Sequence, residues 1–410
     1  MTYHIMSSDR LKGIDYARMR EYRVARTKEM MKKYGIGTMV TWDGWDMRYI
    51  GSLYATVPTR WYEGQFVVLP VNGDPYVFGQ TSFSNLAMRE EMPWLKDKIF
   101  PSPGSTKMVN SVEQIERIIG IIEKIVRDHG LENEAVGLDG CTSEFLVGEA
   151  LGRKGLEAVD GKHAMFMARM IKNEDEIECV RMACSTAEAA FDAIKKAIRP
   201  GVKECELVGI GMERLYALGA DETQEFVCCS GPRTNPLHID YTDRMVRPGD
   251  VVIVDINGNS WHGYKSCYYR TFVCGQATAE MHELYEDARA MMYDAMRHIK
   301  AGVAVADIVE TDFPKSPNYW GYDTIEEVAS YCVGHGLGIS LHEYPFVSYL
   351  IRPPVEGSIF QEGMVLAMET WTGKRGGDFG IRLEENFVVT KDGIDLLTKY
   401  PVDKIIECPL

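Results

Sequence analysis

The chain has 410 residues, of which 45% are hydrophobic and 26% charged, and its formal net charge is −15. This length allows two domains with substantial cores, and the composition is that of an ordinary globular protein. The acidic balance, with no compensating basic block, argues against nucleic acid or an anionic membrane as a partner, and it is compatible with a cationic or zwitterionic small molecule as substrate.

The first part of the chain alternates helix-like and strand-like segments, which is typical of an α/β domain. The strand pair near its centre flanks the turn Val71-Asn72-Gly73. We predict an N-terminal domain over residues 1–165. Its expected elements are a charged helix over 14–34, strands over 37–41, 65–70 and 74–79, a helix over 111–129 and a strand over 135–139.

The second part, residues 166–410, begins with a strong helix signal. Asn173 followed three residues later by Glu176 forms a capping box, the apolar residues that follow have 3-4 spacing, and Pro200-Gly201 ends the pattern. Another long helix is expected over about 278–299, and strands over 363–370 and 383–390. We predict an α+β domain whose long helices back a largely antiparallel sheet.

Histidine and separated acids in this second domain predict its functional site. The segment Gly334–Pro345 contains His335 and is rich in glycine, while Asp255, Glu369 and Glu384 each lie on an apolar run. Burying unpaired carboxylates is costly, so three such acids favour a shared site over three unrelated ones. One histidine and several carboxylates suit a hydrolytic metal site or an acid–base cleft.

The motifs around these residues resemble the pita-bread superfamily, which includes methionine aminopeptidase, Xaa-Pro peptidases and creatinase. The resemblance covers roughly residues 175–410, and the N-terminal domain resembles the one that precedes it in prolidase and creatinase. Further segments are similar to DddP-type dimethylsulfoniopropionate lyases. The motifs are Asp255, GYKS at 263–266, RTF at 270–272, GHGLG to HEYP at 334–345, MET at 368–370 and RLEEN at 382–386; the lyase-like segments are SGPRTNP at 230–236, GGDF at 376–379 and LTKYP at 397–401.

The resemblance implies a metal-ligand set that this chain carries incompletely. Asp255, His335, Glu369 and Glu384 align with four ligands of a dinuclear site, whereas Cys267 stands where a bridging aspartate is expected. A close pair of hard cations needs such bridges, so we predict at most one divalent metal, Fe, Zn or Mn, or none. Cys267 is then a thiolate ligand, a reactive thiol or a small buried hydrophobe. Asn257 aligns with an extra aspartate of the lyases, although Asn257-Gly258 also reads as a hairpin turn, which we favour.

The same resemblance implies residues that contact substrate. His342 and His238 match histidines that peptidases and creatinase use beside the substrate, whereas the aspartate proposed as the base of the lyases is missing. In creatinase-like homodimers the loop at 56–62 reaches the partner's active site. There Arg60 would clamp a carboxylate, and Trp61 or Tyr62 would face a cationic head group.

Three functions remain open. The first is a hydrolase or lyase that cleaves a C–N or C–S bond of a small zwitterion by acid–base chemistry of His335, His342, Glu369, Glu384 and Asp255. The second is an Xaa-Pro dipeptidase, and the third is a non-catalytic binding protein of pita-bread fold. The resemblance to creatinase-like members implies a homodimer. We expect the protein in the cytoplasm, because ten scattered cysteines without a CxxC pair indicate reduced thiols and no run of 18 apolar residues occurs.

Overall fold

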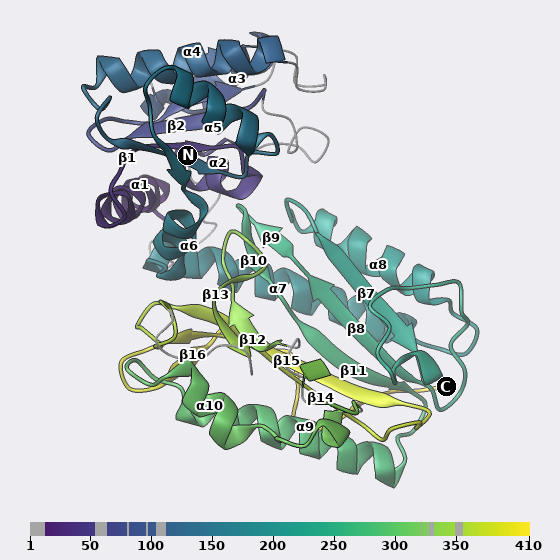
Figure 1. The fold of residues 1–410 in the computed structure, drawn as a ribbon. Helices are drawn as coiled ribbons and strands as arrows, with labels where there is room; N and C mark the ends of the chain where they lie inside the picture. The colour runs from purple at the N-terminus through teal and green to yellow at the C-terminus, as the bar shows by residue number, and fades with distance from the viewer. Residues whose placement is uncertain are drawn as a thin grey trace. The chain divides into compact units, whose positions relative to one another are not determined.

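The structure is a computed structural model that describes residues 13–53, 64–79, 82–95, 97–103, 112–320, 322–324, 326–327, 332–348 and 356–410. The chain divides into two compact units, Asp15–Arg169 and Met170–Leu410 (Figure 1). The boundary predicted after residue 165 falls inside helix α6 (Lys162–Met170). Side chains of the first unit hold that helix, since the Tyr49 hydroxyl donates to Ala168 O at 3.2 Å and Arg169 pairs with Asp46 at 2.9 Å.

The first unit is an α/β domain. Its six-stranded sheet contains parallel and antiparallel pairs and has the strand order β4-β3-β2-β1-β5-β6. The apolar stripe predicted for α4 is buried against this sheet, as its 3-4 spacing requires. The elements expected in this unit are confirmed to within a few residues as α1 (Tyr16–Lys33), β1 (Ile36–Thr41), β2 (Phe66–Pro70), β3 (Tyr76–Gly79), α4 (Val112–Asp128) and β5 (Ala135–Asp139). The sequence reasoning did not predict the remaining elements, which are α2 (Gly44–Gly51), α3 (Ser82–Glu91), β4 (Ile99–Pro101), α5 (Glu144–Arg153) and β6 (Ala158–Asp160).

The second unit contains two sheets that together carry the acids singled out above. A four-stranded sheet has the order β17-β11-β8-β7, and a five-stranded sheet has the order β13-β12-β14-β15-β16. The strands are β7 (Glu225–Ser230), β8 (Val251–Asn257), β11 (Tyr269–Cys274), β12 (Cys332–Gly336), β13 (Glu343–Ser348), β14 (Val365–Gly373), β15 (Gly380–Val389), β16 (Ile394–Leu396) and β17 (Ile406–Cys408), beside the small hairpin β9 (Asn259–Trp261) and β10 (Tyr264–Ser266).

Helices cover these sheets on their outer sides (Figure 1). α7 (Glu174–Ala197) and α8 (Glu204–Ala217) pack on each other and back β7 to β10, while α9 (Ala279–His298) lies along β14 and β15 and α10 (Val305–Asp312) lies beside β13. The capping box predicted at Asn173 and Glu176 is confirmed, with the Glu176 amide 3.0 Å from Asn173 Oδ1. The second unit is therefore α+β, as predicted.

The hairpin favoured at Asn257-Gly258 is wrong. β8 does not fold back on β9 but pairs with β7 and β11, strands distant in sequence, and Asn257 lies opposite Glu225. Gly258 instead marks an irregularity at which the chain leaves the sheet with φ +70°. The tight turn comes later, at His262-Gly263, where both residues have positive φ and connect β9 to β10.

No helix in the described ranges has the length and apolar character needed to cross a membrane.

Candidate active site

Three strands of the second unit bring the three predicted acids to one place. Asp255 lies on β8, Glu369 on β14 and Glu384 on β15, and Glu369 and Glu384 are directly opposite each other across the antiparallel β14–β15 pair. All three are buried. Their charges act on one another, because Asp255 and Glu369 both contribute to raising the pKa of Glu384.

A second set of atoms meets beside these acids. The Cys267 thiol, a ring nitrogen of His335 and a carboxylate oxygen of Glu384 lie within 4.8 Å of one another, and all three residues are buried. Cys267 follows β10, and Asn386 on β15 holds its backbone, since the Cys267 amide donates to Asn386 Oδ1 at 3.2 Å. The Cys267 thiol itself donates to Asn257 Oδ1 at 3.2 Å, so Asn257 faces the site although it forms no hairpin.

The donor atoms of these residues suit one divalent metal ion. Thiolate, imidazole and carboxylate are the donor types that zinc and ferrous iron take. Neither carboxylate oxygen of Glu384 or Asp255 has a hydrogen-bond partner within 3.5 Å among the described residues, and all four oxygens are buried. Uncompensated buried carboxylates are costly, so they must bind a cation or a proton. The set Cys267, His335 and Glu384 could hold one metal ion, with Asp255 and Glu369 close by.

Without such an ion, burial shifts the acids toward their protonated forms. Burial raises the pKa of Asp255 to about 8, and the neighbouring Glu369 charge adds to the rise, while Arg382 and the Tyr269 hydroxyl oppose it. Burial likewise raises the pKa of Glu384 and of the Cys267 thiol well above their ordinary values. A cation would reverse these directions, because it favours the charged form of each ligand.

The two histidines of the glycine-rich segment lie together. The ring centroids of His335 and His342 are 4.4 Å apart. His335 Nδ1 is 2.9 Å from Gly336 O. Since a carbonyl oxygen only accepts, Nδ1 carries the proton and Nε2 presents its lone pair. Removal of surrounding water lowers the pKa of His335, and it lowers that of the partly exposed His342 to about 4, with the His335 ring contributing.

Arg382 is a site residue that the sequence reasoning missed. Its Nη2 donates to Glu369 Oε2, its guanidinium lies 4.2 Å from the ring centroid of Tyr269, and Trp371 is also close. The signal was present, because Arg382 precedes Glu384 by two residues and so shares its face of a strand. Glu369 is therefore neutralised by protein, unlike Glu384 and Asp255.

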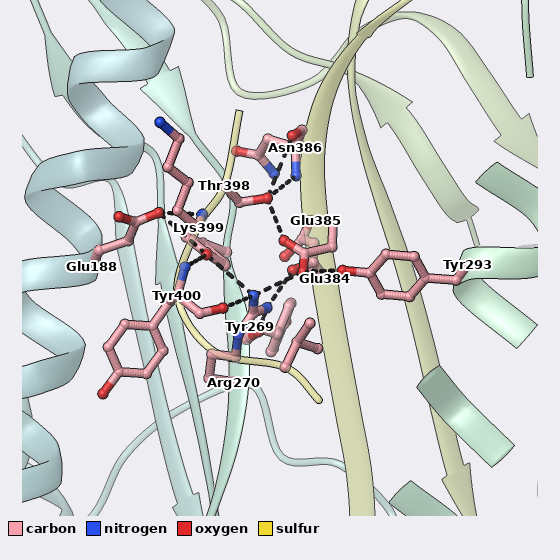
Figure 2. A network of polar contacts seen from close by, with 12 residues as sticks. Glu188, Tyr269, Arg270, Tyr293, Glu384, Glu385, Asn386, Thr398, Lys399 and Tyr400 are labelled. Atoms are coloured by element: carbon pink, nitrogen blue, oxygen red, sulfur yellow. Dashed lines mark hydrogen bonds and ion pairs between the residues drawn. The ribbon is translucent and has the colours of Figure 1, made fainter. Parts of the chain in front are cut away.

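Glu385, the neighbour of Glu384 on β15, belongs to a hydrogen-bond network that supports the site (Figure 2). Glu385 Oε1 accepts from Arg270 Nη2 and from the Tyr293 hydroxyl, each at 2.9 Å. Arg270 is fully buried, and its Nη1 donates to the backbone oxygen of Glu384 at 2.7 Å. The network joins β11 to β15 and thereby fixes the backbone that presents the Glu384 carboxylate.

A buried ion pair fixes the loop that carries His342. Lys172 Nζ is 2.7 Å from Glu343 Oε2, with side-chain exposures of 1% and 0%. The other oxygen of Glu343 accepts from the Ser340 amide at 3.0 Å. Glycine at position 338 leaves room for this ion pair, because a Cβ there would lie 2.7 Å from both Lys172 Cε and Glu343 Oε2 and would displace them. Neither partner was singled out from the sequence, where they are 171 residues apart.

The remaining predicted residues are not part of this cluster. His238 is exposed on the loop after β7, and its Nδ1 is 3.5 Å from Arg233 Nη1. Its neighbours Leu237 and Ile239 line a cavity that also reaches Arg382. Arg60, Trp61 and Tyr62 lie outside the described residues.

The chain belongs to the metallopeptidase family M24, whose model matches residues 178–391. This confirms the predicted pita-bread superfamily and the fold class of both domains. A prolidase from Thermococcus sibiricus has a TM-score of 0.74 at 21% identity, covering 97% of this chain and 100% of that chain. At this identity the likeness shows the fold.

Relatives in this family are named for different activities. The uncharacterized peptidase YqhT of Bacillus subtilis is 30% identical over 61% of this chain and 68% of its own length. The Xaa-Pro dipeptidase of Pyrococcus furiosus is 28% identical over 65% of this chain and 74% of its own. The dimethylsulfoniopropionate lyase DddP of Roseovarius nubinhibens is 26% identical over 69% of this chain and 63% of its own. Family membership therefore indicates a peptidase or lyase and leaves the cleaved bond open.

Proposed function

We propose that this chain cleaves a C–N or C–S bond of a small zwitterion, with at most one divalent metal. The observation that carries the proposal is the position of Cys267, whose thiol shares a cluster with His335 and Glu384 where the family resemblance expects a bridging carboxylate. Two close hard cations need bridging oxygen ligands, and a single thiolate is a poor replacement. The site therefore suits chemistry that one ion, or none, can support.

The chain's own groups can transfer protons at neutral pH. His335 is neutral and presents Nε2 as a base, because its pKa is lowered and Nδ1 faces Gly336 O. Without a metal, Asp255, with its pKa raised to about 8, holds a proton that it can donate to a leaving group. A divalent ion held by Cys267, His335 and Glu384 would supply Lewis acidity and lower the pKa of a bound water.

The charge of the cluster favours a cationic part of the substrate beside it. Asp255, Glu369 and Glu384 carry three potential negative charges, and Arg382 compensates that of Glu369. A sulfonium, quaternary ammonium or guanidinium group would be attracted to the remaining acids when they are ionised. We propose that Arg60 of a partner subunit, with Trp61 and Tyr62, completes the site in a homodimer.

The second candidate is an Xaa-Pro dipeptidase. It is favoured by the adjacent rings of His335 and His342 and by the dipeptidases among the relatives. Its difficulty is again Cys267, since two-metal activation of water needs the missing bridge.

A side-by-side assay separates the two candidates. Dimethylsulfoniopropionate, creatine and ectoine-type compounds are compared with Xaa-Pro dipeptides, each with and without added Mn, Fe or Zn. Turnover of a zwitterion without efficient dipeptide cleavage supports the proposal. Efficient metal-dependent dipeptide cleavage with no turnover of the zwitterions rejects it and establishes the dipeptidase. No turnover of any compound by folded protein rejects both these small zwitterions and the dipeptides as substrates, and leaves a bulkier zwitterion or the binding-protein alternative.

A further inference from the structure

A cavity of about 370 Å³ lies beside the acid cluster, and Arg382 in its lining contacts Glu369. Residues two apart on a strand face the same side. Asp255, Glu369 and Glu384 therefore share their strand faces with three residues that line the cavity. These are Ile253 on β8, Trp371 on β14 and Arg382 on β15.

The walls of this cavity are mainly aromatic and aliphatic. Trp371 packs against Trp320 with ring centroids 4.2 Å apart. Leu237 and Ile239 come from the loop after β7, and Ile381 comes from β15. Ile239 is 66% exposed, so the cavity opens to solvent on that side. Burial of an apolar ligand group against such a wall is favourable, and tryptophan adds favourable ring contacts.

Two charged side chains line the cavity, Arg375 and Arg382, whereas no acidic residue of the described ranges does. Each arginine is paired with a carboxylate outside the lining, Asp323 and Glu369, so the cavity carries little net charge. The guanidinium of Arg382 already lies 5.7 Å from the ring centroid of Trp371. A second cation on that ring would be repelled, so the cavity is unsuited to a cationic head group.

The size of the cavity indicates how large a group it can accommodate. An apolar cavity of about 150 Å³ is sufficient for benzene. The cavity here, of about 370 Å³, has more than twice that volume and is within the usual range for ligand pockets. A dimethylsulfonium or a single methyl group would leave most of it unfilled.

We propose that this cavity is the specificity pocket of the enzyme and binds an apolar group larger than a phenyl ring, while the acid cluster receives the cationic part of the substrate. This inference rests on the proposed function in one respect, namely that the group bound in the cavity is part of a substrate. The substrate class is then a zwitterion with a bulky apolar end, larger than dimethylsulfoniopropionate or creatine.

The test measures binding without turnover. Full-length protein is treated with EDTA and titrated calorimetrically at pH 7.5 with indole, a neutral aromatic ring system larger than phenyl. We expect saturable binding of indole, because the cavity can cover the apolar ring.

Two variants locate the binding. Trp371→Ala should weaken indole binding by about tenfold or more, because it removes one wall. Tyr216→Ala removes an aromatic side chain of α8 that is 49% exposed and is the matched control, with no change expected.

The proposal is overturned if indole shows no saturable binding, or if Trp371→Ala leaves indole affinity unchanged while the protein is folded. Trp371→Phe guards against a folding defect, since it keeps a ring in place and should retain most of the affinity. Because the metal is removed and no product is measured, an enzyme that proves to be a dipeptidase would leave this result standing. Failure of the binding test would likewise leave the turnover assay unaffected.

Discussion

Glu369 and Glu384 lie directly opposite each other on β14 and β15, yet only Glu369 has a cationic side chain, Arg382, as its partner. Glu384 is fully buried and no described residue donates a hydrogen bond within 3.5 Å to either of its oxygens. Two acids with the same strand position thus have different roles. Glu369 is balanced by protein, whereas Glu384 is available to a metal ion, a proton or a substrate.

The first prediction concerns metal content. Purified without added metal, the protein should contain at most one equivalent, and Cys267→Asp should raise this content, because a carboxylate can bridge two ions. Elemental analysis measures it, and Cys205→Ser serves as a control for loss of a thiol. About two equivalents in the unaltered protein would contradict the assignment of Cys267. An unchanged content in Cys267→Asp would show that cleft geometry limits binding.

The second prediction concerns His335. His335→Ala should reduce kcat by at least about 100-fold, because it removes the base and a candidate metal ligand. Circular dichroism and urea unfolding should show a folded protein. His238→Ala, at the exposed loop histidine, should have a smaller effect on kcat. An unfolded His335→Ala variant would mean that the histidine serves the core rather than the reaction.

The third prediction concerns the loop that carries His342. Lys172→Met leaves Glu343 buried without its cation, which should lower the free energy of unfolding by about 3 kcal/mol. The double variant Lys172→Met/Glu343→Gln should recover part of this loss, because no buried charge then remains. Urea unfolding of both variants and of Glu343→Gln forms the cycle. Additive losses in the double variant would show that the two side chains are not coupled.

The fourth prediction concerns pH and the first unit. Burial raises the pKa of Asp139 to about 6, with Asp43 adding to the rise. An unfolded aspartate titrates near about 3.9, so the folded state holds this proton more tightly and stability falls as pH rises from about 4 to about 6. Asp139→Asn removes this slope. Its stability relative to the unaltered protein should increase by up to about 3 kcal/mol over that range.

Urea unfolding at several pH values between 4.5 and 7.5 tests this prediction, and Asp74→Asn, at an exposed acid, is the control. Parallel stability curves for Asp139→Asn and the unaltered protein would contradict it.

The fifth prediction concerns the homodimer. If Arg60 of one subunit serves the site of its partner, mixing inactive His335→Ala with weakened Arg60→Ala should restore activity after subunit exchange. Each mixed dimer then contains one site with His335 from one chain and Arg60 from the other. Sedimentation should show a dimer at micromolar concentration. Failure to restore activity in confirmed mixed dimers, or a monomer, would reject shared sites.

The sequence by itself determined the long helices, several strands and the family. Hydrophobic periodicity and the Asn173 capping box are local signals, and they placed the long helices and the strands β1, β2, β3 and β5 within a few residues. The edge strands β4 and β6 and the short helices of the first unit were not predicted. The spaced motifs identified the superfamily, and three acids on apolar runs indicated a shared site because isolated buried carboxylates are costly.

Only the tertiary structure decided which groups meet. The pairing of β14 with β15 sets Trp371 opposite Arg382, and the ion pair of Lys172 with Glu343 joins residues 171 positions apart. The prediction of a hairpin turn at Asn257-Gly258 was wrong for the same reason, since β8 pairs with β7 and β11 rather than with the strand that follows it. Local propensity is read from neighbours in sequence, whereas the partner of a strand or of a buried charge depends on packing between distant segments.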